Sequence, residues 1–335
     1  MANRLETTTR NFLEPKWVDT VLSSSPLIGR LMTRAVPWVG DKIEIPVKVS
    51  SSTGEFFKGL ATLTRAVTNQ TVKMVFDHTN YHIDVSLPID EVSKNAFAGE
   101  NRILDLAAQQ FASKAQDAAD ELAGIFYSST GANNQFLGLE GIVDDGTNLA
   151  TIGGLSRTTY PTLRAIVNNA GGVLTLDEIS TLLSNITSGT QKPTVGLCNE
   201  AVWDLIEKLI DARDRIIRDV DIVGNGLTLS AGATALFYRG IPIIADEKAT
   251  AQTLYFLNEN TLKFRYFKMV GTQPITLNAK IEGNDYGREV FIGFSSTDWK
   301  MADNQSALVK DIFLSGNLIP ENPKRNGKLI NITSA

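Results

Sequence analysis

Residues 101–127, NRILDLAAQQFASKAQDAADELAGIFY, constrain the fold of this 335-residue chain more strongly than any other stretch. Alanine, the strongest helix former, is frequent in this stretch. At about 1.5 Å per residue the predicted helix would be roughly 40 Å long. We therefore predict a long supporting helix whose small side chains let other elements approach closely. The apolar residues at the helical spacing i, i+3, i+4 and i+7 are Leu104, Ala107, Ala108, Phe111, Ala115, Ala118, Ala119, Leu122 and Phe126.

Two stretches before this helix have the two-residue period of β-strands. In residues 41–49, and again in residues 71–87, apolar residues alternate with polar or charged ones. Pro46 cannot donate a hydrogen bond to a neighbouring strand, which favours an edge position. The connection is polar at residues 50–54, so we predict a long two-stranded excursion with a polar tip. Since an isolated two-stranded ribbon is marginally stable in water, the excursion is expected to lie on another surface.

Residues 1–39 are expected to form an arm that contains two short amphipathic pieces. The first carries Trp17; the second begins at Ser25-Pro26 and carries Leu27 and Leu31. Serine followed by proline at the first helical position is a common helix start. Pieces this short cannot enclose a core of their own. We therefore predict that they cover another surface, such as that of a neighbouring chain.

The chain after the long helix changes character twice. Residues 128–160 are rich in glycine and predict a loop passage. Residues 161–270 alternate between helix and strand patterns, and residues 271–335 are β-rich. One helix is expected to end near Gly189, and Asn199 is expected to cap another. This alternation indicates a mixed α/β block between two other parts of the chain.

Three strands are predicted inside the α/β block, at residues 193–198, 238–244 and 253–257. Each is a short apolar run, which is typical of a buried strand. Residues 258–260, Asn-Glu-Asn, predict the turn of a hairpin that continues into a strand at residues 262–266. The sequence shows no internal repeat, so a solenoid or propeller is not expected.

The composition describes a chain with an ample apolar core and a mildly acidic charge. Hydrophobic residues make up 43%, and 32 Lys+Arg stand against 37 Asp+Glu, for a net charge of −5. A dedicated DNA reader presents a basic face, so contacts with DNA are expected to be weak or local. The single cysteine, Cys198, can form no disulfide within the chain, which fits a reducing compartment. With no secretory signal and no apolar run near the roughly 20 residues that span a bilayer, we expect neither export nor membrane insertion.

Residues that could support metal or catalytic chemistry are sparse. His78 and His82 are four apart, but they lie in a strand pattern without further ligands nearby, so we predict no metal site. Residues 144–148, Asp-Asp-Gly-Thr-Asn, lack the spacing of a calcium-binding loop and predict a turn. Cys198 ends an apolar run and is expected in the core. The sequence has no nucleophile elbow, phosphate loop or dinucleotide fingerprint, so we predict no catalytic residue, no cofactor and no enzyme.

The order of these parts resembles the major capsid protein of tailed bacteriophages. An arm, a long β-excursion, a long helix, a glycine-rich passage, an α/β block and a β-rich return follow one another over nearly the whole chain. Their order is a stronger signal than any single motif. The local sequences that also resemble this family are residues 138–142 with Asn148, Gly153-Gly154 and Thr159-Tyr160, residues 192–203, and residues 238–243.

The resemblance implies an α+β chain with the tailed-phage major capsid protein fold. That fold has a long spine helix, a β-hairpin extended loop, and peripheral and axial domains. The implied division is an N-terminal arm at residues 1–39, an extended β-loop at 40–95, the spine helix and first part of the peripheral domain at 96–160, the axial domain at 161–270, and the return into the peripheral domain at 271–335.

The function implied by the resemblance is structural. Copies of the chain would self-assemble through hexamers and pentamers into an icosahedral shell that encloses phage double-stranded DNA. The partners would be other copies of the chain, a portal and a decoration protein. A separate scaffolding protein is also implied, because the arm is too short to contain a scaffolding segment, unless the gene product was processed. DNA would be contacted non-specifically. The implied location is the virion, after assembly in the host cytoplasm.

Contacts between subunits are expected at three places along the chain. In the family some members cross-link a loop lysine to a neighbour's asparagine, and Lys58 is the lysine here that is suitably placed. No glutamate that would assist such a bond is evident, so plain packing of the adjacent aromatic residues is the preferred reading. The residues expected to contact neighbours are Trp17, Leu27, Leu31, Phe56, Phe57, Lys58, Arg213, Asp214 and Arg215.

Two other functions remain open. A bacterial nanocompartment shell shares the capsid fold and would enclose enzyme cargo, although its usual chains are shorter and lack so long an excursion. A soluble α/β enzyme built on residues 161–270 is the third reading. It would need a convergent set of titratable groups, and two histidines and one cysteine offer little material for one.

Overall fold

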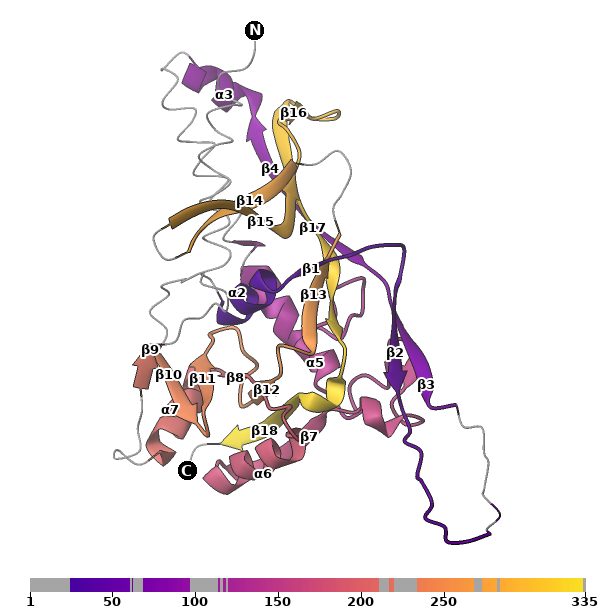
Figure 1. Cartoon of the computed structure of the whole chain (residues 1–335). Coiled ribbons are helices and arrows are strands. Elements are labelled where there is room, and N and C mark those ends of the chain that lie inside the picture. Colours follow the sequence, from indigo (N-terminus) through magenta and orange to yellow (C-terminus); the bar gives the residue numbers. More distant parts are fainter. Residues whose placement is uncertain are drawn as a thin grey trace.

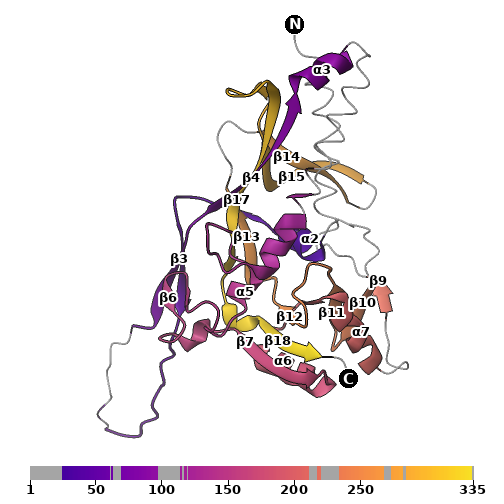
Figure 2. The same cartoon turned by 180° about the vertical axis from the view of Figure 1, so that it is seen from behind.

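The computed structural model describes residues 25–60, 62, 69–96, 114, 117, 118, 120–210, 217–219, 234–267, 273–281 and 284–333. Two seven-stranded sheets organise these residues, and a two-stranded ribbon projects from the body beside them (Figures 1 and 2). Among the described helices, none combines the length and the apolar character needed to cross a bilayer.

The first sheet is built around one long strand, β17. Its order is β1-β13-β17-β15-β14, and β4 and β16 also pair with β17. β4 runs antiparallel to β17 over ten residue pairs, from Ala307↔Pro88 to Gly316↔Thr79. The strands of this sheet are β1 (Val36–Pro37), β4 (Thr79–Pro88), β13 (Leu262–Tyr266), β14 (Gln273–Ile281), β15 (Asn284–Ser296), β16 (Lys300–Met301) and β17 (Ala307–Pro320).

The second sheet has the order β7-β18-β12-β8-β11-β10-β9. Apolar side chains bury both of its faces. In β12, Leu254 and Phe256 pack with the helices α6 and α7, whereas Tyr255 and Leu257 join the central core. Burial on both faces explains why the strands read as continuous apolar runs. The elements are β7 (Ile166–Val173), α6 (Leu176–Ile186), β8 (Val195–Cys198), α7 (Glu200–Leu209), β9 (Ile217–Asp219), β10 (Thr234–Tyr238), β11 (Ile241–Ala245), β12 (Leu254–Leu257) and β18 (Gly327–Thr333).

Both helices of the second sheet have capped N-termini. Thr175 and Glu178 form a reciprocal capping box at the start of α6. Asn199 accepts a hydrogen bond from the Val202 amide at 3.1 Å and caps α7. The predicted cap at Asn199 and the buried strand before it are therefore confirmed.

The ribbon consists of β2 (Ile43–Lys48) and β3 (Thr71–Phe76), which pair only with each other. The remaining short elements connect the ribbon, the sheets and the core. They are α2 (Pro26–Thr33), α3 (Ile89–Ala96), α5 (Leu139–Ile142), β5 (Thr151–Ile152), β6 (Leu155–Ser156), and the 3-10 turns η1 (Pro161–Leu163) and η2 (Pro323–Arg325).

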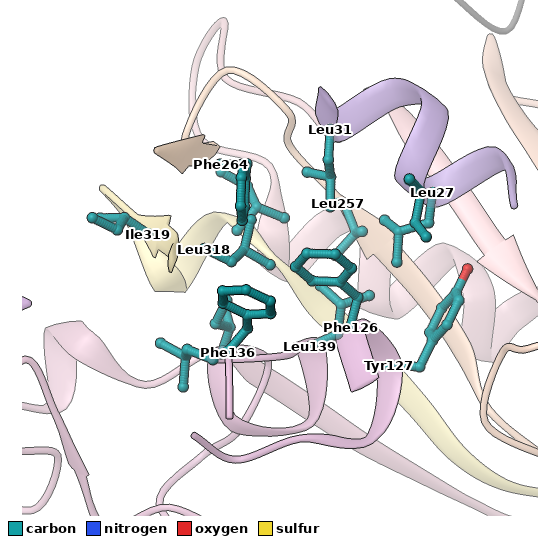
Figure 3. Packing of buried hydrophobic residues seen from close by; sticks show 14 of the residues in the cluster. Leu27, Leu31, Phe126, Tyr127, Phe136, Leu139, Leu257, Phe264, Leu318 and Ile319 are labelled. Carbon is teal, nitrogen blue, oxygen red and sulfur yellow. The ribbon is translucent and has the colours of Figure 1, made fainter. Parts of the chain in front are cut away.

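Residues from distant parts of the chain meet in one central core (Figure 3). The rings of Phe126, Phe136 and Phe264 pack against one another, with centroids 5.7–5.9 Å apart. Residues 120–128 are helical, with Leu122 and Phe126 buried four positions apart. This is the end of the predicted long helix; residues 101–113, 115, 116 and 119 lie outside the described residues.

The structure corrects three predictions about strands. The predicted strand at 71–87 is two strands, because β3 pairs with β2 and β4 leaves to pair with β17. The predicted strand at 238–244 is interrupted by a hairpin turn, since Arg239 and Gly240 have positive φ angles of 51° and 80°. The predicted hairpin around residues 258–260 is wrong because β12 and β13 belong to different sheets.

Sheet membership crosses the predicted domain boundaries. β18 lies between β7 and β12, so the end of the chain belongs to the second sheet. β13, predicted inside the axial block, belongs to the first sheet instead. The division into peripheral and axial domains stays a prediction.

Candidate assembly surfaces

The tip of the ribbon carries the largest exposed apolar side chains of the described chain. Phe56 and Leu60 are fully exposed, at 106% and 109%, and Phe57 is 62% exposed. They lie in the long connection between β2 and β3, which extends away from both sheets (Figure 1). Lys58, between the aromatic pair and Leu60, is also exposed. Large apolar side chains exposed to this degree and clustered in sequence indicate an interaction site.

The base of the ribbon is fastened to the body at Gly153, in the turn between β5 and β6. The Val75 amide donates to the Gly153 carbonyl oxygen at 2.9 Å. Gly153 has a φ angle of +54°, and a Cβ atom there would lie 2.6 Å from the Cβ of Met74. Since Met74 is completely buried, only glycine allows this close approach.

Two clefts open along β2, between the ribbon and the body. The first, of about 420 Å³, is lined by residues that include Lys42, Glu44, Arg265 and Glu321. The second, of about 390 Å³, continues past Pro46 toward η1 and η2. The ribbon is therefore separated from the body along part of its length. The edge of β2 that does not pair with β3 is accessible.

Helix α2 is part of the chain's own core. Leu27 and Leu31 are buried, at 2% and 3% exposure, and pack against the central cluster (Figure 3). Arg30 donates from Nε and Nη2 to the two carboxylate oxygens of Glu259, at 2.5 and 2.8 Å. The prediction that Leu27 and Leu31 contact a neighbouring chain is corrected, because their own chain covers them.

The start of α2 is held by a second buried carboxylate. Ser25 donates its hydroxyl to Asp246 at 2.6 Å, and Tyr127 donates to the same oxygen at 2.9 Å. Burial and the nearby Asp246 charge raise the pKa of the Tyr127 phenol well above its usual value, so it remains a donor. The Ser25-Pro26 sequence predicts the helix start, but no local pattern predicts the partner Asp246, which is 221 residues away.

The two histidines have separate surroundings. His78 stacks on Phe267, with ring centroids 5.4 Å apart, and meets Trp38 edge-on at 5.9 Å. The exposed His82 ring lies 2.9 Å from an oxygen of Asp311. In the described part of the chain, no three His, Cys, Asp or Glu residues come together in a way that could hold a metal ion.

The acidic loop at residues 144–148 is a structural turn. The Asp144 carboxylate accepts hydrogen bonds from the amides of Gly146, Asn148 and Leu149. Its charge is balanced by Arg157, whose Nη1 lies 2.9 Å away and whose side chain is fully buried. The prediction of a turn is confirmed, whereas the buried arginine had not been anticipated.

Cys198 is buried, as predicted, and burial raises the pKa of its thiol. An inert core cysteine fits this environment. Trp17, Arg213, Asp214 and Arg215, which were predicted to contact neighbours, lie outside the described residues. Contact of Phe56, Phe57 and Lys58 with another subunit stays a prediction, and their exposure is compatible with it.

Comparison with solved structures finds the same fold in several capsid and encapsulin proteins. A capsid protein of cyanophage A-1(L) superposes with a TM-score of 0.66 at 19% identity, over 92% of this chain and 93% of that one. The chain has the fold of phage major capsid proteins. The SrpI encapsulin of Synechococcus elongatus shares this fold, with a TM-score of 0.58 at 11% identity over 96% of this chain and 89% of its own. The capsid of a native GTA particle gives 0.55 at 12% identity, over 91% of each chain.

The comparison of structures identifies the capsid fold, whereas two sequence comparisons find no match. No protein-family model and no curated protein sequence matches the chain. The predicted resemblance to tailed-phage capsid proteins and the predicted α+β class are confirmed at the level of the fold.

Proposed function

We propose that this chain is a structural protein that self-assembles through hexamers and pentamers into an icosahedral shell around phage double-stranded DNA. The observation that carries the proposal is the exposure of Phe56, Phe57 and Leu60 at the tip of the projecting β2–β3 ribbon. In a lone chain this apolar surface stays in water, whereas another copy can cover it. The capsid fold supports another copy of the same chain as the partner.

The other partners follow from the same function. A portal and a separate scaffolding protein would take part in assembly, and a decoration protein would bind the finished shell. The net charge of −5 supports only weak, non-specific contact with packaged DNA, since tight binding needs many phosphate contacts from lysine and arginine. The shell would form in the host cytoplasm and reside in the virion, and the chain would act without catalysing a reaction.

A nanocompartment shell is the second candidate, favoured by the similarity to the encapsulin. That similarity covers 96% of this chain, so length does not separate the two functions. The contents of the particle distinguish the two functions. Packaged DNA supports the phage shell, whereas an enclosed enzyme supports the nanocompartment.

Electron microscopy and light scattering of the purified protein, with and without the scaffolding protein, test the proposal. Closed particles or sheets of hexamers are the expected result. Phe56→Ser with Phe57→Ser should raise the critical concentration for assembly at least about tenfold, because each aromatic contributes about 1.5–3 kcal/mol when buried. The paired control, Ser50→Ala with Ser51→Ala in the same loop, should assemble normally. A wild-type chain that stays monomeric under all these conditions contradicts the proposed function.

A further inference from the structure

The second cleft beside β2 has the properties of a binding site for an acidic segment. It has a volume of about 390 Å³ and lies between the end of β2, η1 and η2. Pro46, Val47, Leu163 and Pro323 supply apolar walls. A cleft with apolar walls and charged rims suits a peptide segment better than a free ion.

The charge of this cleft is positive and incompletely balanced. Lys48, Lys324 and Arg325 line it, and within the described part of the chain no carboxylate forms an ion pair with any of the three. Arg325 uses one nitrogen to donate to the Ile186 carbonyl oxygen at 3.1 Å. Glu321 is the acidic residue of the lining, and Lys263 and Arg265 already hold it at 3.1 and 3.5 Å. The three cations are therefore available to an external carboxylate.

The cleft also offers backbone and hydroxyl groups. Val49 donates its amide to Gln70 on the β3 side, and in an antiparallel pair the hydrogen-bonded residues alternate. The backbone groups of Pro46 and Lys48 therefore point away from β3, and both residues line the cleft, although Pro46 has no N–H to donate. The Thr162 hydroxyl, whose oxygen is buried, has no hydrogen-bond partner.

The complementary charge lies at the opposite end of the molecule. Asp90 and Glu91 are adjacent, exposed carboxylates in the first turn of α3, and no described residue forms an ion pair with them. Figures 1 and 2 show α3 far from the end of β2 and from η2. One chain cannot bring these two surfaces together, but two copies arranged head to tail can. Such a heterologous contact generates a ring when its rotation closes.

We propose that the Lys48–Lys324–Arg325 cleft of one copy binds the Asp90–Glu91 turn of a second copy. The inference rests on the proposed shell function and adds a defined contact to it. A nucleic-acid phosphate is less well matched, because Glu321 and four apolar residues share the lining. The contact would fix the direction in which subunits follow one another around a ring.

Charge reversal tests the contact in the full-length protein. Lys48→Glu with Lys324→Glu should raise the critical concentration for assembly at least tenfold without changing the melting temperature. Adding Asp90→Lys and Glu91→Lys to the same chain should restore assembly, because the pairing is re-formed with opposite signs. The charge-matched control, Lys192→Glu with Lys208→Glu, changes the net charge equally at exposed positions outside the cleft and should assemble normally. Impaired assembly without rescue overturns the assignment of Asp90 and Glu91.

A cysteine cross-link separates failure of the contact from failure of shell assembly. A mixture of Lys324→Cys and Asp90→Cys chains is oxidised, and the native Cys198 does not interfere because it is buried. A disulfide-linked dimer that forms in the mixture and in neither variant alone is the expected result. Shells without this dimer overturn the contact and leave the proposed function standing, whereas neither shells nor dimer overturns both. Unchanged assembly of Lys48→Glu with Lys324→Glu, together with lost binding to a short DNA duplex, would assign the cleft to phosphate instead.

Discussion

Glu259 holds α2 through a buried ion pair with Arg30. Its side chain is 5% exposed, and it accepts hydrogen bonds from Arg30 and from the Thr194 hydroxyl. Removing two charges from water is unfavourable unless geometry and further hydrogen bonds compensate. The paired hydrogen bonds from Arg30 meet this condition, so the loss of either partner would leave an uncompensated buried charge.

Glu259→Gln is expected to lower the free energy of unfolding by about 3 kcal/mol at neutral pH, measured by urea denaturation. Burial raises the pKa of Glu259, but the hydrogen bond and charge of Arg30, with Thr194 and Arg34, outweigh it, so the pKa falls below its ordinary 4.5. A lowered folded-state pKa stabilises the protein fully above the unfolded value. The advantage of the wild type should therefore shrink as the pH falls below 4.5 and vanish below the folded-state pKa.

The control for this prediction is Asp120→Asn. Asp120 pairs with Lys248 at 3.8 Å, and the two side chains are 50% and 31% exposed. A surface pair of this kind contributes less than about 1 kcal/mol. A loss of stability in Glu259→Gln that is no larger than in Asp120→Asn, or that does not change between pH 7 and pH 3, would contradict the role assigned to Glu259.

Residue pairs of this kind could be predicted only in part. The serine at position 25 and the asparagine at 199 follow local capping rules, which need a few neighbouring residues. Arg30 and Glu259 are 229 positions apart, and no local pattern connects them. Arg157 is close to Asp144 in sequence, but an arginine beside an acidic loop is usually exposed, so its complete burial had no sequence signal.

The ribbon is the element whose orientation matters most for assembly, and Gly153 sets that orientation. Gly153→Ala should increase hydrogen exchange of the β3 amides, because the added Cβ would press on Met74 and separate the ribbon from its support. Overpacking of this kind costs about 1–3 kcal/mol, in addition to about 1 kcal/mol for alanine at positive φ. We also expect weaker assembly, since the tip would be displaced.

Gly154→Ala is the matched control for the ribbon. Gly154 also has a positive φ angle, +76°, but nothing lies within 4 Å of the position of an added Cβ. It should show the backbone strain alone, with normal exchange in β3. Equal effects of the two substitutions would mean that the contact with Met74 does not hold the ribbon.

Elements with a strong local period were predicted well, and pairings between elements less well. The alternation in β2 and the capped helix α7 depend on neighbours in sequence, and both are found as expected. The break between β3 and β4 depends on β17, some 230 residues further on. The absence of a hairpin between β12 and β13 likewise depends on two sheets that exist only in the folded chain.

At the scale of the whole molecule, the C-terminal strand β18 completes the second sheet, which is otherwise built from the middle of the chain. β18 is the only link between β7 and the rest of the second sheet among the described strands. Its Leu329 and Ile332 side chains are buried against the helices of that sheet, and Lys328 pairs with Glu140 at 2.9 Å. Residues of both sheets contribute to one central core. Loss of β18 should therefore destabilise both sheets. The ribbon tip is the opposite case, because it is exposed and belongs to neither core.

Two deletions of equal length should therefore behave in opposite ways. Removal of residues 327–333 strips β7 of its partner and takes Leu329 and Ile332 out of the core. Each of these two residues contributes about 2–5 kcal/mol, and together they rival the 5–15 kcal/mol stability of an ordinary domain. We expect this chain to lose its near-ultraviolet circular dichroism and its cooperative melting. Removal of residues 51–57 should leave both unchanged, because no core residue is touched, yet it should prevent particles from forming in the electron microscope. A folded chain without β18, or normal particles without the tip, would contradict this division between residues that fold the subunit and residues that join subunits.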